Sequence, residues 1–294
     1  MSRRPSFTGL VRGELLKSSR QATTWLFLLV MFGGIGFSML AMLGAGNIKT
    51  EWQHVPTETA YTMLDVLSVV LSIGTGIVLL GLTARVIGQE YQSGTIRILL
   101  ARGVGRLQLL FAKLAAVSIW ALLILAAGIA VYLAFLLLTV QAWDGGTGRL
   151  SALPAAFWAD LRLRVLVLLL SEASCILLAT GVSVAGRSLS IGMAVALGWF
   201  PAENLATLAI ILINRVTNQD FWLHIPDYLL GPNLNVLSGT FQHDHAARPA
   251  FATPLTHVSD AHIQLVVLAF GVVFLAVSMV LTARRDVIAG SRAG

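Results

Sequence analysis

Long uninterrupted apolar blocks most restrict how this chain of 294 residues can fold. A helix of 18 or more apolar residues is long enough to cross the hydrocarbon core of a bilayer. We therefore predict an all-α membrane protein. Its six transmembrane helices are expected at about residues 24–43, 61–87, 109–140, 165–185, 191–213 and 261–282. Between them, residues 47–59 and 141–160 are predicted as loops, because they are polar and carry Gly or Pro.

The composition agrees with a membrane protein and argues against a soluble one. Hydrophobic residues make up 56% of the chain and charged residues 12%, against about 45–50% and 25% in soluble domains. A net charge of +6 would suggest nucleic acid in a soluble protein. Here the basic residues flank the apolar blocks. We therefore expect contact with the lipid bilayer and not with nucleic acid.

The N-terminal region precedes the first apolar block. In residues 7–20 apolar side chains interleave with charged ones, which predicts an amphipathic helix lying in the membrane interface. The alternative is an ordinary positive flank of the first span. The apolar stretch from Trp25 to Leu43 exceeds the 7–15 residues of a signal-peptide core. We therefore expect a retained anchor.

Basic residues are distributed unevenly between the two sides of the predicted membrane. Six spans place both termini on one side, together with the loops 88–108 and 186–190. That side holds 14 of the 20 Lys and Arg residues. The other side holds six: Lys49, Arg149, Arg162, Arg164, Arg215 and Arg248. The positive-inside rule then puts both termini in the cytoplasm, and we expect the plasma (inner) membrane of a prokaryote. Residues 214–260 form an external segment, and Arg162 and Arg164 are expected to reach outer headgroups.

The loop after the second span carries the most specific pattern. Glu90 follows the span, and a Ser-Gly-Thr turn comes next at residues 93–95. We predict Thr95 as the N-cap of a short amphipathic helix. This helix has an apolar face and projecting basic side chains, formed by Ile96, Leu99 and Leu100 and by Arg97 and Arg102. Such a helix offers a surface on which another protein can dock.

This string resembles the coupling loop of type-2 ATP-binding cassette (ABC) exporter permeases. In that family a Glu follows the second span, then Gly-Thr, a Leu-rich turn, an Arg, and a Lys that enters the third span. The matching positions are Glu90, Gly94, Thr95, Leu99, Leu100, Arg106 and Lys113. Where the family often has Pro-x-Ser-Arg, this chain has Gly-Val-Gly-Arg at residues 103–106, so we expect the short helix to end less sharply. Residues 14–17 (Glu-Leu-Leu-Lys) also resemble the family's entry helix.

The resemblance implies a single transmembrane permease domain over residues 1–294, with a cytoplasmic coupling helix in the loop 88–108. A separate ABC ATPase, in two copies, would bind this loop, and a second permease chain would complete a homodimer or heterodimer. The implied ATPase-contacting residues are Glu90, Gly94, Thr95, Arg97, Arg102 and Arg106. The chain lacks a Gly-x-x-x-x-Gly-Lys-[Ser/Thr] phosphate loop. ATP and Mg²⁺ are therefore expected in the partner, with no cofactor and no enzymatic activity in this chain.

Two acidic residues lie within predicted spans, Glu172 in the fourth and Glu203 in the fifth, where Pro201 interrupts the helix. A charged side chain at membrane depth costs roughly 2.5–3.5 kcal/mol and usually marks function. We hypothesise that Glu172, Glu203 and the adjacent Asn204 line the substrate pathway. The alternatives are that these residues make hydrogen bonds between helices, or that Glu172 stays protonated.

Other function classes fit less well. Cys175 is the single cysteine and is expected to be a small buried hydrophobe. His243, His245, His257 and His262 match no standard metal-site spacing, so no metal is predicted. An intramembrane metalloprotease would need His-Glu-x-x-His, which does not occur. An ion-coupled carrier without an ATPase would explain the acidic residues but not the loop. We therefore predict export of a substrate, which no motif identifies.

Overall fold

The computed structural model describes residues 6–45, 47–240 and 254–284. These residues form helices joined by short turns, with no strand in the described ranges. The α-helices are α1 (Phe7–Ser19), α2 (Ala22–Gly44), α3 (Ile48–His54), α4 (Pro56–Ser93), α5 (Thr95–Ala101), α6 (Arg106–Asp144), α7 (Gly148–Ser151), α8 (Ala155–Gly186), α9 (Leu189–Thr217), α10 (Leu230–Val236) and α11 (Asp260–Arg284). Short 3₁₀ helices flank α10.

Six of the described helices are long and apolar enough to cross a membrane, namely α2, α4, α6, α8, α9 and α11. Each encloses one of the predicted spans and extends beyond it at both ends. The prediction of an all-α membrane protein with six transmembrane helices is therefore confirmed.

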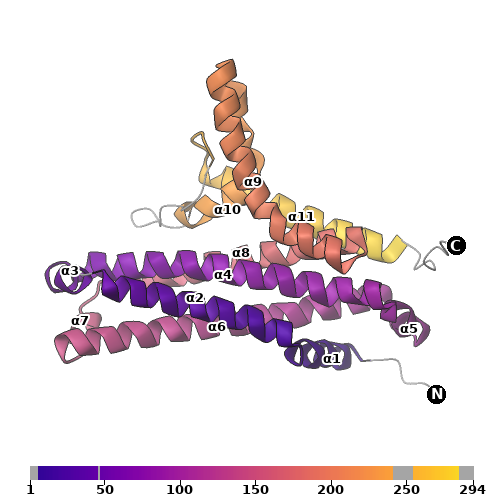
Figure 1. Cartoon of the computed structure of the whole chain (residues 1–294), viewed down its shortest axis with the longest axis horizontal. Helices are drawn as coiled ribbons and strands as arrows, with labels where there is room; N and C mark the ends of the chain where they lie inside the picture. The colour runs from indigo at the N-terminus through magenta and orange to yellow at the C-terminus, as the bar shows by residue number, and fades with distance from the viewer. Residues whose placement is uncertain (1–5, 46, 241–253, 285–294) are drawn as a thin grey trace.

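The central helix is α4, which packs against α2, α6, α8 and α9. Figure 1 shows α2, α4, α6 and α8 running side by side, while α9 runs obliquely away from them and its last turns project from the bundle. Both described chain ends and α5 lie at one end of the bundle, which we call the α5 end. Helices α3 and α7 lie at the opposite end, the α3 end (Figure 1).

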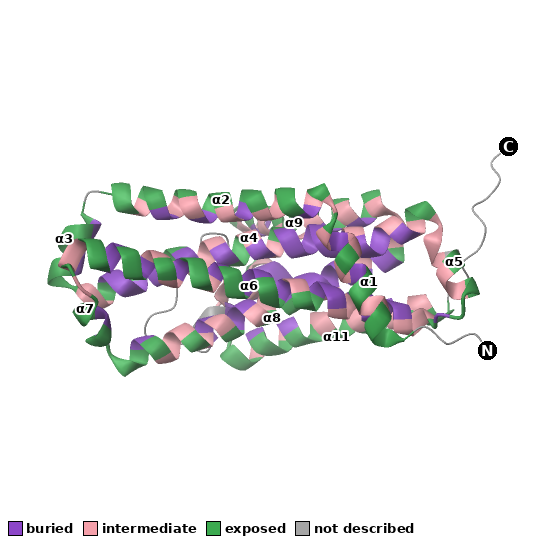
Figure 2. Cartoon of the chain, turned by 90° about the horizontal axis from the view of Figure 1, so that it is seen from below, coloured by how far each residue is buried: buried purple, intermediate pink, exposed green. Residues whose placement is uncertain are grey.

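Burial follows helix contacts rather than the polarity of the side chains. Large apolar side chains on the outer faces stay exposed, among them Leu29 (70%), Phe37 (75%) and Leu138 (71%), and Figure 2 shows such exposed faces along the spans. A bilayer would cover these faces. Inside, helices approach closely: a Cβ added at Gly88 of α4 would lie 2.7 Å from the backbone of Leu189 in α9. Only glycine fits at that crossing.

The prediction of loops at residues 47–59 and 141–160 is largely wrong. The first holds α3 and the start of α4; the second holds the end of α6, α7 and the start of α8. Ile48 and Trp52 lie four residues apart on the buried face of α3, and the Trp52 indole donates to the Asp144 carboxylate at 2.8 Å. Pro56 starts α4, where its missing N–H costs nothing. Tertiary contacts thus order a segment that is polar in sequence.

Two polar side-chain contacts join α4 and α8 toward the α3 end. The Tyr61 hydroxyl donates to Asp160 at 2.6 Å, and Arg164 forms an ion pair with Asp65 one turn further along both helices. Arg164 is only 3% exposed, so the prediction that it reaches outer headgroups is wrong, because it pairs inside the bundle. Arg162 remains exposed.

Candidate functional site

The junction between α4 and α5 depends on the backbone conformation of one glycine. Gly94 has φ of 66° and is both the C-cap of α4 and the N-cap of α5. Glycine adopts this left-handed conformation without steric cost. The prediction that Thr95 caps α5 is therefore wrong, because Thr95 is already helical. Its hydroxyl oxygen lies 2.9 Å from that of Ser93.

Helix α5 ends in a tight glycine turn. The N–H of Val104 donates to the Leu99 carbonyl at 3.2 Å and the N–H of Gly103 to the Leu100 carbonyl at 3.0 Å, with Gly103 at φ of 82°. This pair of bonds is a Schellman motif. The expectation of a less sharp end is wrong, since Gly103 supplies the left-handed residue.

The two faces of α5 differ in exposure. Ile96, Leu99 and Leu100 are partly buried, as the amphipathic pattern predicts. On the other side, Ile98 is 55% exposed and Arg102, one turn later, is also exposed. An apolar side chain beside a cation at the tip of the bundle is suited to contact with another protein. Sequence reasoning passed over Ile98, although its position opposite the apolar face was a usable signal.

A buried ion cluster lies behind α5. Lys113 Nζ lies 2.9 Å from Glu14 Oε1 of α1 and 2.9 Å from Glu90 Oε1 of α4, and donates to the Val86 carbonyl at 2.9 Å. Lys17 approaches Glu90 at 3.5 Å. Glu14, Glu90 and Lys113 are 8%, 3% and 4% exposed. A buried ammonium is tolerated only when it is paired in this way. The cluster therefore ties α1, α4 and α6 together.

Helix α1 turns a polar face toward the bundle. Glu14 and Ser18 are its buried residues, and the Trp120 indole of α6 donates to Ser18 at 2.8 Å. Phe7 and Leu16 stay exposed. A helix is present over the predicted residues, and polar side chains form its inward side; its position in the membrane interface stays a prediction. Burial raises the pKa of the Glu14 carboxyl above its ordinary value, against the opposing attraction of Lys113.

The structure separates the residues predicted to contact an ATPase. Gly94, Thr95 and Arg102 lie at the tip of the α5 end. The Glu90 carboxylate faces inward, into the ion cluster, and the Arg106 guanidinium donates to the Ala283 carbonyl of α11 at 3.3 Å. Arg97 lies in α5, and its side chain is outside the described part. The contact itself stays a prediction for all six residues.

The predicted substrate-pathway residues fall in two different interfaces. Glu172 is 2% exposed and lies against Thr75, in the contact between α8 and α4. Glu203 instead accepts from the Trp199 indole at 2.9 Å and from the backbone N–H of Gly231. It thereby fixes the start of α10 on α9. Asn204 beside it is partly buried. Their role in a pathway stays a hypothesis.

Other predicted features have simple outcomes. Cys175 is buried and unpaired, as expected of a small hydrophobe. His243 and His245 lie outside the described residues. Within the described ranges, no group of three or more His, Cys, Asp or Glu residues could hold a metal ion.

Six helices long and apolar enough to cross a membrane, with a short glycine-bounded helix joining the second and third at the tip of the bundle, define a multi-pass membrane protein. The model of the family "ABC-2 family transporter protein" matches residues 10–201, and the chain belongs to this family. It is a membrane component of an ABC transporter. The match includes α5, the ion cluster and α9 as far as Pro201. No curated protein matches the chain.

Proposed function

We propose that this chain is the permease subunit of an exporter driven by a separate ATPase that docks on α5. The observation that carries the proposal is the exposed pair Ile98 and Arg102 on a helix that the bundle presents at its tip. Family membership supports an ATPase partner. The sequence has no phosphate loop, which supports the proposal that ATP and Mg²⁺ bind in that partner.

The proposed orientation puts the α5 end in the cytoplasm of a prokaryotic cell. The excess of Lys and Arg in the segments assigned to this side supports it. Two ATPases and a second permease chain, identical or different, complete the proposed assembly. The substrate is left open, because the acidic residues within the spans lie in helix contacts that do not select a chemical class.

We expect movement of α5 to reach the spanning helices in two ways, through the peptide chain and through the buried ion cluster. Gly94 joins α5 directly to α4, and Glu90 lies one turn before it. A displacement of α5 by the ATPase would pull on Glu90, hence on Lys113 of α6 and Glu14 of α1. Separating these charges in a buried site is costly. The three helices are therefore expected to move together when nucleotide closes the ATPase.

The test is capture of the tagged chain from membranes in mild detergent, with mass spectrometry of what accompanies it. The wild type should retain a nucleotide-binding ATPase in stoichiometric amount. Ile98→Asp should lose it, because a desolvated charge replaces an apolar contact. Val216→Asp is the matched control, since Val216 is 86% exposed at the end of α9. A wild-type chain that purifies without any ATPase, in detergent and in nanodiscs, would contradict the proposal and favour the ion-coupled carrier.

A further inference from the structure

The turn between α5 and α6 is fixed by hydrogen bonds on both sides. On the α5 side, these bonds form the Schellman motif at Gly103. On the α6 side, the Gly105 N–H donates to the Gln108 side chain at 3.4 Å, and the Gly105 carbonyl accepts from the Leu109 N–H at 2.9 Å. Val104, between the two sets of bonds, is 5% exposed. A displacement of α5 is therefore expected to move the first turn of α6 with it.

Arg106 begins α6 and reaches a different span. Its guanidinium donates to the Ala283 carbonyl at 3.3 Å, and the two residues are 177 positions apart in the sequence. Ala283 lies in the last described turn of α11. A guanidinium carries several N–H donors at the end of a long side chain, and hydrogen bonds from a charged donor are stronger than neutral ones. Arg106 thus connects the turn after α5 to the last of the six long apolar helices.

Apolar side chains support this contact from behind. Leu107 and Leu110, in the first turns of α6, lie in one apolar cluster with Met279 and Leu281 of α11, to which α4 and α8 also contribute. Leu110 is 4% exposed, and Met279 and Leu281 are partly buried. The end of α11 is therefore packed against the start of α6, beside the loop that carries α5.

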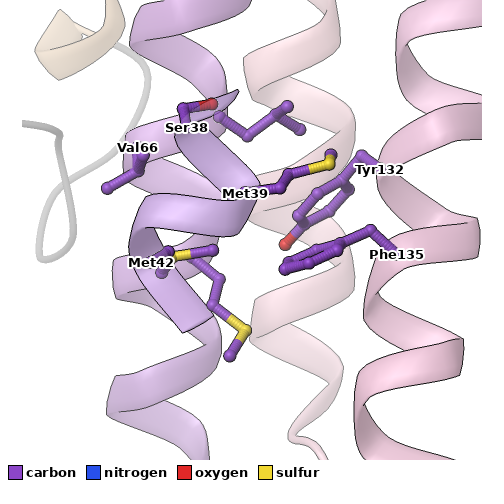
Figure 3. Close-up of a pocket in the computed structure, with 8 residues that line it drawn as sticks. Ser38, Met39, Met42, Val66, Tyr132 and Phe135 are labelled. Atoms are coloured by element: carbon purple, nitrogen blue, oxygen red, sulfur yellow. The ribbon is translucent and has the colours of Figure 1, made fainter. Parts of the chain in front are cut away.

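The helices α2, α4 and α6 pack closely further along the bundle. Figure 3 shows Tyr132 and Phe135 of α6 directed toward Met39 and Met42 of α2. The cavity between the three helices has a volume of about 10 Å³, room for about one water. Close packing of this kind transmits displacement from one helix to the next. By contrast, α11 is the least buried of the six long apolar helices that the structure describes. Its contacts at the α5 end therefore matter more for its position.

We propose that Arg106 is a positioning residue that couples the end of α5 to α11, so that an ATPase acting on α5 also moves the last span. Gly94 joins the start of α5 to α4, and Arg106 joins the turn after α5 to α11. Helix α5 is thereby connected at its two ends to different helices. The inference rests on the proposed docking of an ATPase on α5. It gives Arg106 a role within the chain in place of the predicted contact with the ATPase.

Hydrogen exchange of the full chain, purified with its ATPase, tests the connection. In Arg106→Ala the amides of residues 280–284 should exchange roughly two- to tenfold faster, which corresponds to the loss of about one hydrogen bond. Arg12→Ala, at an exposed arginine of α1, is the matched control and should leave these amides unchanged. Arg106→Ala should retain as much ATPase as the wild type. Loss of the ATPase from this variant would return Arg106 to the docking surface and overturn the proposal.

A nucleotide response separates coupling from a purely structural contact. In the wild type, a non-hydrolysable ATP analogue should change the exchange of amides near Glu90 in α4 and near Ala283 in α11. Arg106→Ala should keep the first change and lose the second. A short bismaleimide link between Arg106→Cys and Ala283→Cys should restore the second change. The native Cys175 is buried and does not compete for the linker.

The outcomes distinguish this inference from the proposed function. A wild-type chain that binds no ATPase would overturn both. A wild-type chain that binds the ATPase, but whose α11 amides respond to nucleotide in the same way as those of Arg106→Ala, would overturn the role of Arg106 alone.

Discussion

Lys113 Nζ of α6 lies 2.9 Å from Glu90 Oε1 of α4, with both side chains buried. Glu90 lies one turn before Gly94, the glycine that joins α4 to α5, so this contact links the end of α4 next to α5 to α6. Glu14 of α1 shares the same ammonium. Family resemblance gives the positions of Glu90 and Lys113 in sequence, and the structure gives their relation as partners.

Removing the cation should destabilise the protein more than removing the whole cluster. Lys113→Met leaves two buried carboxylates facing each other and should cost about 3–5 kcal/mol. The triple variant Lys113→Met, Glu14→Gln and Glu90→Gln should recover most of this loss. Unfolding in detergent measures both, with Lys49→Met at exposed Lys49 as the control. A triple variant no more stable than the single one would contradict the ion cluster.

The raised pKa of Glu14 predicts a pH dependence of stability. In the folded chain Glu14 keeps its proton to a higher pH than the ordinary value of 4.5. Its contribution to stability is therefore full below 4.5 and is lost as pH rises through the folded-state pKa. Glu14→Gln should flatten this part of the profile. Melting temperatures of wild type and variant, measured from pH 4 to pH 8, check it. Parallel profiles would show that Glu14 does not titrate in this way.

Glu203 should anchor the segment after α9. Its carboxylate accepts from the Gly231 N–H and the Trp199 indole. Glu203→Ala removes both acceptors and should cost about 1–3 kcal/mol. The amide of Gly231 should then exchange its hydrogen faster, while amides in α6 should not. Unchanged protection at Gly231 would mean that other contacts hold α10.

Single-cysteine labelling tests the proposed orientation. Cys175 is the single native cysteine and is buried, so it gives a low background. Arg102→Cys and Lys49→Cys introduce exposed thiols at the α5 end and the α3 end. In intact cells an impermeant maleimide should label position 49, and it should reach position 102 only after permeabilisation. The reverse pattern would invert the orientation.

The sequence predicts the spanning helices well because apolar length alone decides them. The same rule fails at residues 47–59, since the buried face of α3 rests on a bond from Trp52 to Asp144, 92 residues away. The sequence of residues 47–59 does not reveal that Trp52 has a partner at Asp144. The helix ends at Gly94 and Gly103 depend on left-handed backbone angles that the residue types permit but do not require.

The candidate site is predictable in part for a similar reason. The string from Glu90 to Lys113 identifies the loop, but not that Glu90 faces inward to Lys113 while Ile98 faces outward. The sequence predicts Glu203 as a pathway residue because a charged side chain within a span usually marks function, and it gives no sign of the Gly231 contact. That contact arises only when α10 folds back onto α9.

If an ATPase docks on α5, crosslinking in living cells should capture it there. A photoreactive amino acid replaces Ile98, or Val216 as the control, and the crosslinked product is identified by mass spectrometry. We expect a nucleotide-binding ATPase to be joined to position 98 and to be absent from position 216. A chain that crosslinks at position 98 to no ATPase, although it is folded and in the membrane, would contradict it.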